Sequence, residues 1–123
     1  MPQLLAGIRV LVVEDHSDSR DMVEEALVFL GAQVITAATA EAGVRRLGEA
    51  DVVITDYSLP GHDGVWLLER IKDAGLTIPT VLVSGFAAVH VPEVAAAHCS
   101  LKFLKPIDPL ELGRQVGLLL GRQ

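Results

Sequence analysis

The sequence predicts an α/β domain in which a doubly wound, five-stranded parallel sheet is flanked by five helices. Five short apolar runs rich in β-branched residues recur along the chain, and a segment of helical character follows each of them. The runs are almost continuously hydrophobic, which is typical of parallel strands that helices cover on both faces. Five repeats of strand and helix imply right-handed crossovers within one sheet.

The predicted strands have lengths typical of buried parallel strands. In chain order they are Ile8–Val13, Gln33–Ala37, Asp51–Thr55, Ile78–Val83 and Leu101–Leu104.

The predicted helices lie between and after these strands, at Ser17–Leu30, Ala40–Gly48, Asp63–Ala74, Pro92–Ala97 and Pro109–Leu120. The first places Met22, Ala26, Leu27 and Leu30 on one apolar stripe. The fourth is expected to be short, because a proline disfavours helical backbone in the preceding residue. The last opens on Asp108 as a cap, with proline at the first helical position.

The bulk properties limit the possible classes of protein. A chain of 123 residues is one domain's worth, predicted to span 1–123 with its core at about 7–121. The net charge of −6 argues against nucleic-acid binding, and the single cysteine, Cys99, excludes an internal disulfide. We find neither a signal peptide nor an apolar run that could span a bilayer, so we expect a cytoplasmic protein without a membrane partner.

Polar residues follow the predicted strands where each strand ends. The ends run into Glu14 and Asp15, Asp56, Ser84, and Lys105. Ligands of open α/β sheets bind beyond the carboxyl ends of the strands, so these groups should converge. Any one of them could be an ordinary loop residue. The set is harder to explain in that way, because three clustered carboxylates repel one another and need a cation.

Phosphoryl transfer with Mg²⁺ would use every member of this set. Mg²⁺ prefers carboxylate, water and phosphate oxygens. A carboxylate such as Asp56 can attack phosphorus and form an aspartyl phosphate. The metal, an ammonium group and a hydroxyl would neutralise the charge on the transferred group.

Four segments carry a family resemblance, namely VLVVEDHSDSR, VVITDYSLPGHDG, VLVSGF and KFLKPID. In this order they closely resemble the receiver domains of two-component response regulators, including the chemotaxis receivers, over essentially the whole chain. The resemblance implies a flavodoxin-like sheet with strand order 2-1-3-4-5. It also implies that Asp56 is phosphorylated, and that Glu14, Asp15, Asp56 and the backbone carbonyl of Ser58 hold Mg²⁺.

The resemblance further implies a switch at the ends of the last two strands. Ser84 would be the hydroxyl that moves to the phosphate, and Lys105 would pair with the phosphate. Pro106 matches a family proline that often follows a cis bond.

Several nearby residues have simpler interpretations. Asp15 can cap the helix that follows it as well as bind metal. Asp63 is a better helix cap than ligand, and Gly64 serves loop geometry. His16 and His62 could bind a transition metal adventitiously, but no spacing resembles a zinc site. Trp66 should be partly exposed, either covering apolar surface or contacting a partner.

One position departs from the family pattern. Many receivers carry Tyr or Phe three residues before the lysine of the fifth strand, and here that residue is Lys102. Phe103 should point to the opposite face of the strand. A lysine cannot be buried as a ring is, which puts the usual route from phosphate to output surface in doubt.

The leading functional hypothesis is therefore a receiver, monomeric or weakly dimeric. It would take a phosphoryl group from a histidine kinase or phosphotransfer protein and signal by protein contact. Beyond self-phosphorylation and autodephosphorylation we expect no enzymatic activity. A fragment of a hybrid kinase would look similar. The alternatives are a scaffold that signals without phosphorylation, favoured only by Lys102, and an aspartate-nucleophile phosphohydrolase, which would need an aspartate where Ser58 stands.

Overall fold

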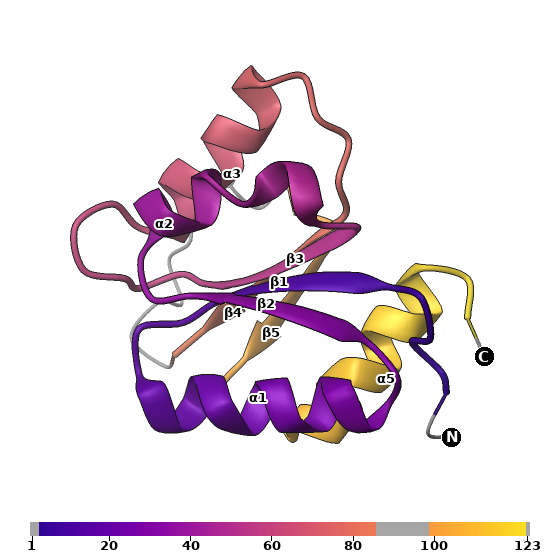
Figure 1. The fold of residues 1–123 in the computed structure, drawn as a ribbon. Coiled ribbons are helices and arrows are strands. Elements are labelled where there is room, and N and C mark those ends of the chain that lie inside the picture. The colour runs from indigo at the N-terminus through magenta and orange to yellow at the C-terminus, as the bar shows by residue number, and fades with distance from the viewer. Residues whose placement is uncertain (1–2, 86–98, 123) are drawn as a thin grey trace.

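The five predicted strands form one parallel sheet in the computed structural model, which describes residues 3–85 and 99–122. The strand order is β2-β1-β3-β4-β5, as the family resemblance implied (Figure 1). The strands are β1 (Arg9–Val13), β2 (Gln33–Ala37), β3 (Val52–Asp56), β4 (Thr80–Ser84) and β5 (Leu101–Leu104).

Helices cover both faces of the sheet. Helices α1 (Ser17–Phe29) and α5 (Pro109–Leu119) lie on one face (Figure 1). Helix α2 (Ala40–Val44), the short 3₁₀ helix η1 (Leu47–Glu49) and α3 (Gly64–Asp73) lie on the other. The fourth predicted helix, 92–97, falls outside the described residues.

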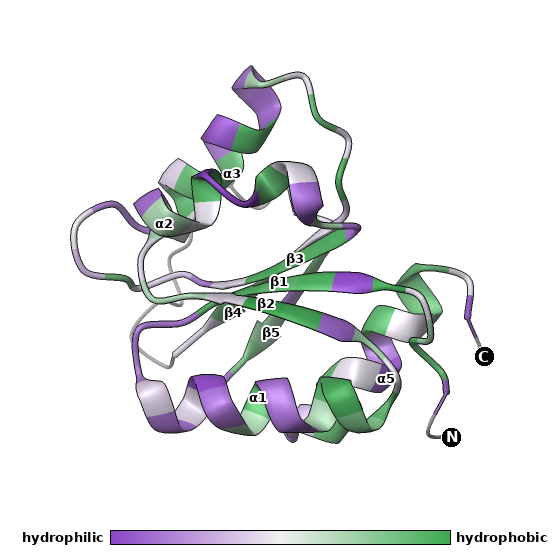
Figure 2. Ribbon diagram, in the orientation of Figure 1, coloured by the Kyte–Doolittle hydropathy of each residue, from purple (hydrophilic) through white to green (hydrophobic). Residues whose placement is uncertain are grey.

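Strands β1 and β3 each supply side chains to both apolar cores, because successive side chains of a strand point to opposite faces of the sheet. Val10, Val12 and Ile54 pack under α1 and α5. Leu11 and Val53 pack under α2 and α3. Every residue of β3 and β4 is buried, and Figure 2 shows the hydrophobic character of the strands at the centre of the molecule. This agrees with the continuous hydrophobic runs of the sequence.

Several elements begin or end one or two residues from their predicted bounds, and the differences at α2 and β3 matter most. The helix expected over Ala40–Gly48 ends at Val44 and resumes as η1. Strand β3 extends by one residue to include Asp56, whose backbone pairs with Val83 of β4. The nucleophile candidate is thus part of the sheet instead of the loop, and this fixes the position of its backbone.

Helices α1 and α5 approach each other closely at a glycine. A Cβ on Gly113 would clash with the side chain of Leu30 and lie 3.3 Å from Cδ2 of Leu27. The absence of a side chain there lets the two leucines fill the space between the helices. Within the described residues, no helix is long and apolar enough to cross a bilayer.

Candidate functional site

The carboxyl ends of β1, β3 and β5 bring three charged side chains together. Glu14 follows β1, Asp56 ends β3, and Lys105 follows β5. Glu14 and Asp56 are only 5% and 7% exposed, so their charges are largely removed from water. Ser84 ends β4 and is also buried, with its backbone beside that of Leu104.

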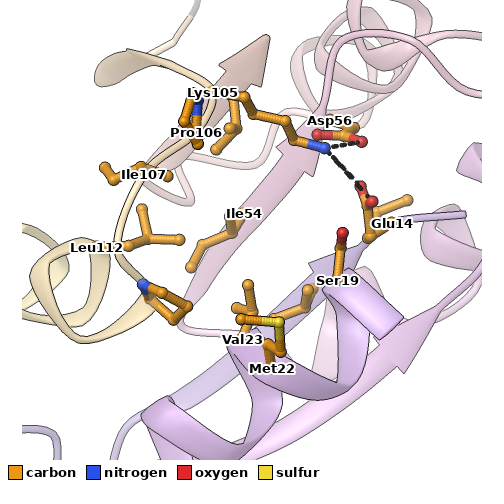
Figure 3. Close-up of a pocket in the computed structure, with 14 residues that line it drawn as sticks. Glu14, Ser19, Met22, Val23, Ile54, Asp56, Lys105, Pro106, Ile107 and Leu112 are labelled. Atoms are coloured by element: carbon orange, nitrogen blue, oxygen red, sulfur yellow. Dashed lines mark hydrogen bonds and ion pairs between the residues drawn. The ribbon is translucent and has the colours of Figure 1, made fainter. Parts of the chain in front are cut away.

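Lys105 lies between the two buried carboxylates. Its Nζ donates to Oδ2 of Asp56 at 2.8 Å and lies 3.3 Å from Oε2 of Glu14 (Figure 3). The lysine side chain is 34% exposed, so the cluster opens toward solvent on its side. An opposite charge in contact with both carboxylates offsets part of their repulsion.

A cation site can be built from the acidic residues of the same edge. Glu14, Asp15, His16 and Asp56 each offer one ligand atom, and these atoms lie within 4.8 Å of one another. Oδ1 of Asp15 is buried without a hydrogen-bond partner among the described residues. Nδ1 of His16 lies 3.4 Å from both Oδ1 of Asp15 and Oε1 of Glu14. Three carboxylates with an unsatisfied oxygen fit a hard divalent cation such as Mg²⁺.

The crowding of carboxylates changes their affinity for protons. Burial, followed by the hydrogen bond with Glu14, raises the pKa of Asp56 to about 7, although Lys105 opposes the change. Burial also acts to raise the pKa of Glu14, but the hydrogen bond from Asp56 and the charge of Lys105 outweigh it, and the pKa falls. The pair therefore holds one proton more readily than two isolated carboxylates would.

Burial acts to lower the pKa of Lys105, but its contacts with Asp56 and Glu14 outweigh this effect and raise the pKa. The lysine thus stays charged at neutral pH, ready to interact with any anion that reaches Asp56.

The loop after Asp56 packs tightly because of Gly64. A Cβ there would clash with the backbone oxygen of Asp56, so the sequence-based expectation of a loop-geometry role gains a specific contact. The Gly64 amide donates to the backbone carbonyl oxygen of Tyr57 at 2.8 Å. Asp63 caps α3 by accepting from the Trp66 amide at 2.9 Å, as predicted. The first turn of α3 is thereby held against the end of β3.

Asp15 is not the N-cap residue of α1, and its predicted interaction with the dipole of that helix stays a prediction. The capping position is His16, whose side chain makes no capping hydrogen bond. The Asp15 carboxylate is held instead beside Glu14 and His16. Its metal-binding role stays a prediction. So does that of the Ser58 carbonyl, which belongs to an exposed residue of the loop after β3.

The remaining predicted residues lie where the sequence placed them. The Lys105–Pro106 bond is cis. Lys102 is exposed on β5, while Phe103 packs against the core under α1 and α5, as the strand alternation predicted. His62 lies away from the carboxylates and stacks on Trp66 with ring centroids 4.0 Å apart. Trp66 is half-buried against the core under α2 and α3, so it does cover apolar surface.

A cavity that the sequence did not predict lies beside the site. It has a volume of about 260 Å³ and reaches from Asp56 and Lys105 to Ser19 and Met22 of α1 (Figure 3). Met22 was predicted on the buried stripe, but it is 57% exposed. The helical period of α1 gave the correct side of the helix, but Met22 lies on the wall of this cavity, together with Pro109 at the start of α5.

Among curated sequences, some relatives match this chain over nearly their whole length, and others are much longer than it. An uncharacterised 14.6 kDa protein encoded in the sodA1 3′ region of Leptolyngbya boryana is 32% identical, over 93% of this chain and 91% of its own length. The Regulator of RpoS of Escherichia coli K12 is 31% identical over 94% of this chain. There the chain spans only 35% of the relative's length.

Solved structures share the fold over nearly the whole chain. A CheY-like response regulator receiver domain protein of Methanospirillum hungatei superposes with a TM-score of 0.80 at 27% identity, covering 93% of this chain and 94% of its own. The response regulator TrrA of Thermotoga maritima, in complex with Mg²⁺–BeF, gives a TM-score of 0.81 at 23% identity, covering 91% and 98%.

The family comparison agrees with the element order and with the sheet. The response regulator receiver domain family matches residues 10–116, which reach from β1 into α5. This chain belongs to the response regulator receiver domain family of two-component signal transduction.

Proposed function

We propose that this domain is a phosphoacceptor, which takes a phosphoryl group onto Asp56 from a phosphohistidine of a histidine kinase or phosphotransfer protein. The observation that carries the proposal is the contact of the buried Asp56 carboxylate with Lys105 beside two further carboxylates. An aspartate that only ended a strand would need neither the buried lysine contact nor acidic neighbours.

In the proposed reaction an Asp56 carboxylate oxygen attacks phosphorus. The bond between phosphorus and the histidine nitrogen breaks, and its electron pair stays on the imidazole of the donor. Lys105 exchanges its contact with the Asp56 carboxylate for one with a phosphoryl oxygen. The Ser84 hydroxyl donates to another phosphoryl oxygen. Both contacts stabilise charge that the buried edge would otherwise leave unpaired.

Glu14, Asp15 and Asp56, with the Ser58 carbonyl, would hold Mg²⁺. The ion, when bound, neutralises the carboxylates and draws charge from the phosphoryl oxygens. The unsatisfied Oδ1 of Asp15 supports this assignment, since a buried carboxylate oxygen without a partner is costly. The Mg²⁺–BeF complex of the Thermotoga maritima relative gives general support from within the family.

Signalling would follow through protein contact, and we propose no enzymatic activity beyond phosphorylation and autodephosphorylation at Asp56. The alternative, a scaffold that works without phosphorylation, is favoured by the exposed Lys102 of β5 alone. The contact of Asp56 with Lys105 and the acidic side chains beside it favour the phosphoacceptor.

The test is phosphorylation by acetyl phosphate with Mg²⁺, followed by intact mass measurement. The wild-type chain should gain one phosphoryl group, and Asp56→Asn should gain none. Asp51→Asn is the matched control, because Asp51 immediately precedes the same strand at its opposite end. That variant should be phosphorylated normally. An acid-stable phosphate mapped to a serine, or one retained by Asp56→Asn, would refute the proposal.

A further inference from the structure

His16 lies at the cation site, but the proposed function gives it no role. It follows Glu14 and Asp15 directly and occupies the N-cap position of α1, where its backbone carbonyl accepts from the Arg20 amide at 2.9 Å. The residues preferred at this position cap the helix with a short polar side chain. The imidazole makes no capping hydrogen bond and lies beside the carboxylates instead. The stability of α1 therefore does not explain a histidine in this position.

The contact between the imidazole and Asp15 is not an ordinary hydrogen bond. Nδ1 of His16 lies 3.4 Å from Oδ1 of Asp15 and also 3.4 Å from Oε1 of Glu14. Oδ1 of Asp15 is nevertheless buried without a hydrogen-bond partner among the described residues. Nδ1 and Oδ1 can each offer a lone pair, and they lie close together with no hydrogen bond between them. A metal ion bound by both atoms would satisfy this arrangement.

The spacing of the polar atoms matches the coordination shell of one ion. With bond lengths of about 2.1 Å, neighbouring ligand atoms of a tetrahedral or octahedral ion lie roughly 3.0 to 3.4 Å apart. The two separations of 3.4 Å from Nδ1 of His16 fall at the upper end of this range. One ligand atom each from Glu14, Asp15, His16 and Asp56 lies within 4.8 Å of all the others. Opposite ligands of an octahedron are roughly 4.2 Å apart, so a small adjustment brings the four atoms to one ion.

Burial and charge favour an imidazole on the solvent side of this ion. Glu14 and Asp56 are buried, whereas the side chain of His16 is 74% exposed and can adjust without moving the buried residues. When ionised, the carboxylates of Glu14, Asp15 and Asp56 carry three negative charges, and Lys105 in contact with two of them carries one positive charge (Figure 3). The remaining two negative charges match a divalent ion. A neutral imidazole adds a ligand and leaves this balance unchanged.

We propose that His16 is a ligand of this cation site and makes the site selective for a divalent transition-metal ion, such as Ni²⁺ or Zn²⁺, over Mg²⁺. Mg²⁺ prefers oxygen ligands, whereas an imidazole nitrogen suits the transition metals. A nitrogen ligand therefore increases the affinity for these ions and contributes little to the binding of Mg²⁺. This assignment rests on the cation site of the proposed function, but it does not depend on phosphorylation of Asp56.

Calorimetric titration of the untagged chain with NiCl₂ and with MgCl₂ at pH 8 tests the proposal. His16→Gln should raise the Kd for Ni²⁺ about tenfold or more, because a nitrogen ligand is lost, and should leave the Kd for Mg²⁺ unchanged. His62→Gln is the matched control, since His62 stacks on Trp66 away from the carboxylates, and it should change neither Kd. Thermal unfolding without metal checks that both variants keep the fold.

Nitrogen-15 NMR of the imidazole rings identifies the ligand directly. One equivalent of ZnCl₂ should shift the Nδ1 resonance of His16, and MgCl₂ should leave it in place. An Nδ1 resonance that ZnCl₂ does not move would overturn the proposal.

The titrations separate a failure of this proposal from a failure of the proposed function. An unchanged Kd for Ni²⁺ in His16→Gln, with Mg²⁺ still bound, would refute the role of His16 alone. Tighter binding of both ions by the variant would also refute it, because the imidazole would then act as a positive charge that competes with the metal. A wild-type chain that binds neither ion would refute the cation site itself, and with it the metal requirement of the proposed function.

Discussion

Strands β1 and β3 are joined by charged residues at both of their ends, and the two ends differ in kind. At the amino end Arg9 pairs with Asp51 through hydrogen bonds of 2.8 to 3.3 Å to the carboxylate. At the carboxyl end Glu14 meets Asp56, and two like charges are buried with only Lys105 to offset them. The first pair is complete in itself and open to solvent. The second is complete only with a further cation.

The difference separates a structural contact from a binding site. The hydrogen bond with Arg9 lowers the pKa of Asp51, because the folded protein favours its charged form. The pKa of Asp56 is raised, because burial and Glu14 disfavour the charged form. Both aspartates are strand-end residues in the sequence. Only the second lies in surroundings that would improve when a cation and a phosphoryl group arrive.

The largest expected effect of breaking the carboxyl-end cluster is on metal binding. Asp15→Ala should weaken Mg²⁺ binding by roughly 10- to 100-fold and slow phosphorylation by acetyl phosphate, because it removes a carboxylate from the ligand set. The measurement is calorimetric titration with MgCl₂. Asp51→Ala serves as the control and should bind Mg²⁺ as the wild type does. Full phosphorylation in excess chelator would contradict the metal requirement.

The pH dependence of Mg²⁺ affinity should follow the raised pKa of Asp56. With a pKa of about 7, the carboxyl is mostly protonated at pH 6 and mostly ionised at pH 8, so protons compete with the metal at the lower pH. The apparent affinity should fall by roughly tenfold between pH 8 and pH 6. Titrations at several pH values with the same ionic strength measure it. An affinity independent of pH would show that Asp56 is already ionised without metal.

In the metal-free protein, substitutions at the two ends of β3 should change the free energy of unfolding in opposite directions. A carboxyl whose folded pKa is raised contributes stability that is present below its unfolded pKa and is lost as pH rises through about 7. Asp56→Asn should therefore stabilise the protein at pH 8, on the order of 1 kcal/mol, and less at pH 5.

Asp51→Asn should instead lower the free energy of unfolding, and only slightly, because an exposed ion pair contributes little to stability. Urea unfolding of both variants at the two pH values compares them. If Asp56→Asn destabilised the protein at pH 8 instead, the charge of Lys105 would have to compensate the repulsion between the carboxylates in full.

The smallest effect on stability and phosphorylation should come from replacing Lys102. Its side chain is exposed on β5, and Lys102→Ala should leave both stability and phosphorylation nearly unchanged. Amide exchange with and without a phosphoryl mimic should show changes mainly in the loops after Asp56 and Ser84, which can gain contacts with the phosphate. Large protection changes across Leu101–Leu104 that vanish in the variant would instead identify Lys102 as part of the switch.

Most of the architecture could be predicted from local sequence patterns. Continuous apolar runs and turn residues indicated five parallel strands, and parallel strands place their carboxyl ends at one edge. Glu14, Asp56 and Lys105 were therefore expected at the same edge of the sheet. The cap of α3 at Asp63 was also predictable, because a side chain three residues ahead of its partner amide is a local relation.

Contacts between distant segments required the tertiary structure. The helical period placed Met22 on the inner side of α1, but its exposure depends on how α5, a distant segment of the chain, packs beside it. Asp15 could serve equally as cap or ligand until its carboxylate was found beside Glu14 and His16. The need for glycine at position 64 likewise depends on two elements, because any side chain there would clash with the backbone of Asp56.

The family resemblance implied the strand order, and the sequence by itself determined where the strands lie, that they run parallel, and the edge at which the charges meet. These follow from periodicity and chain direction, which are properties of each segment alone. Only the tertiary structure decided that Lys105 touches both carboxylates, that Oδ1 of Asp15 lacks a hydrogen-bond partner, and that Met22 of α1 stays exposed. Those outcomes depend on packing distances between segments, because burial and the strength of a charge interaction are set by whatever the rest of the chain brings alongside.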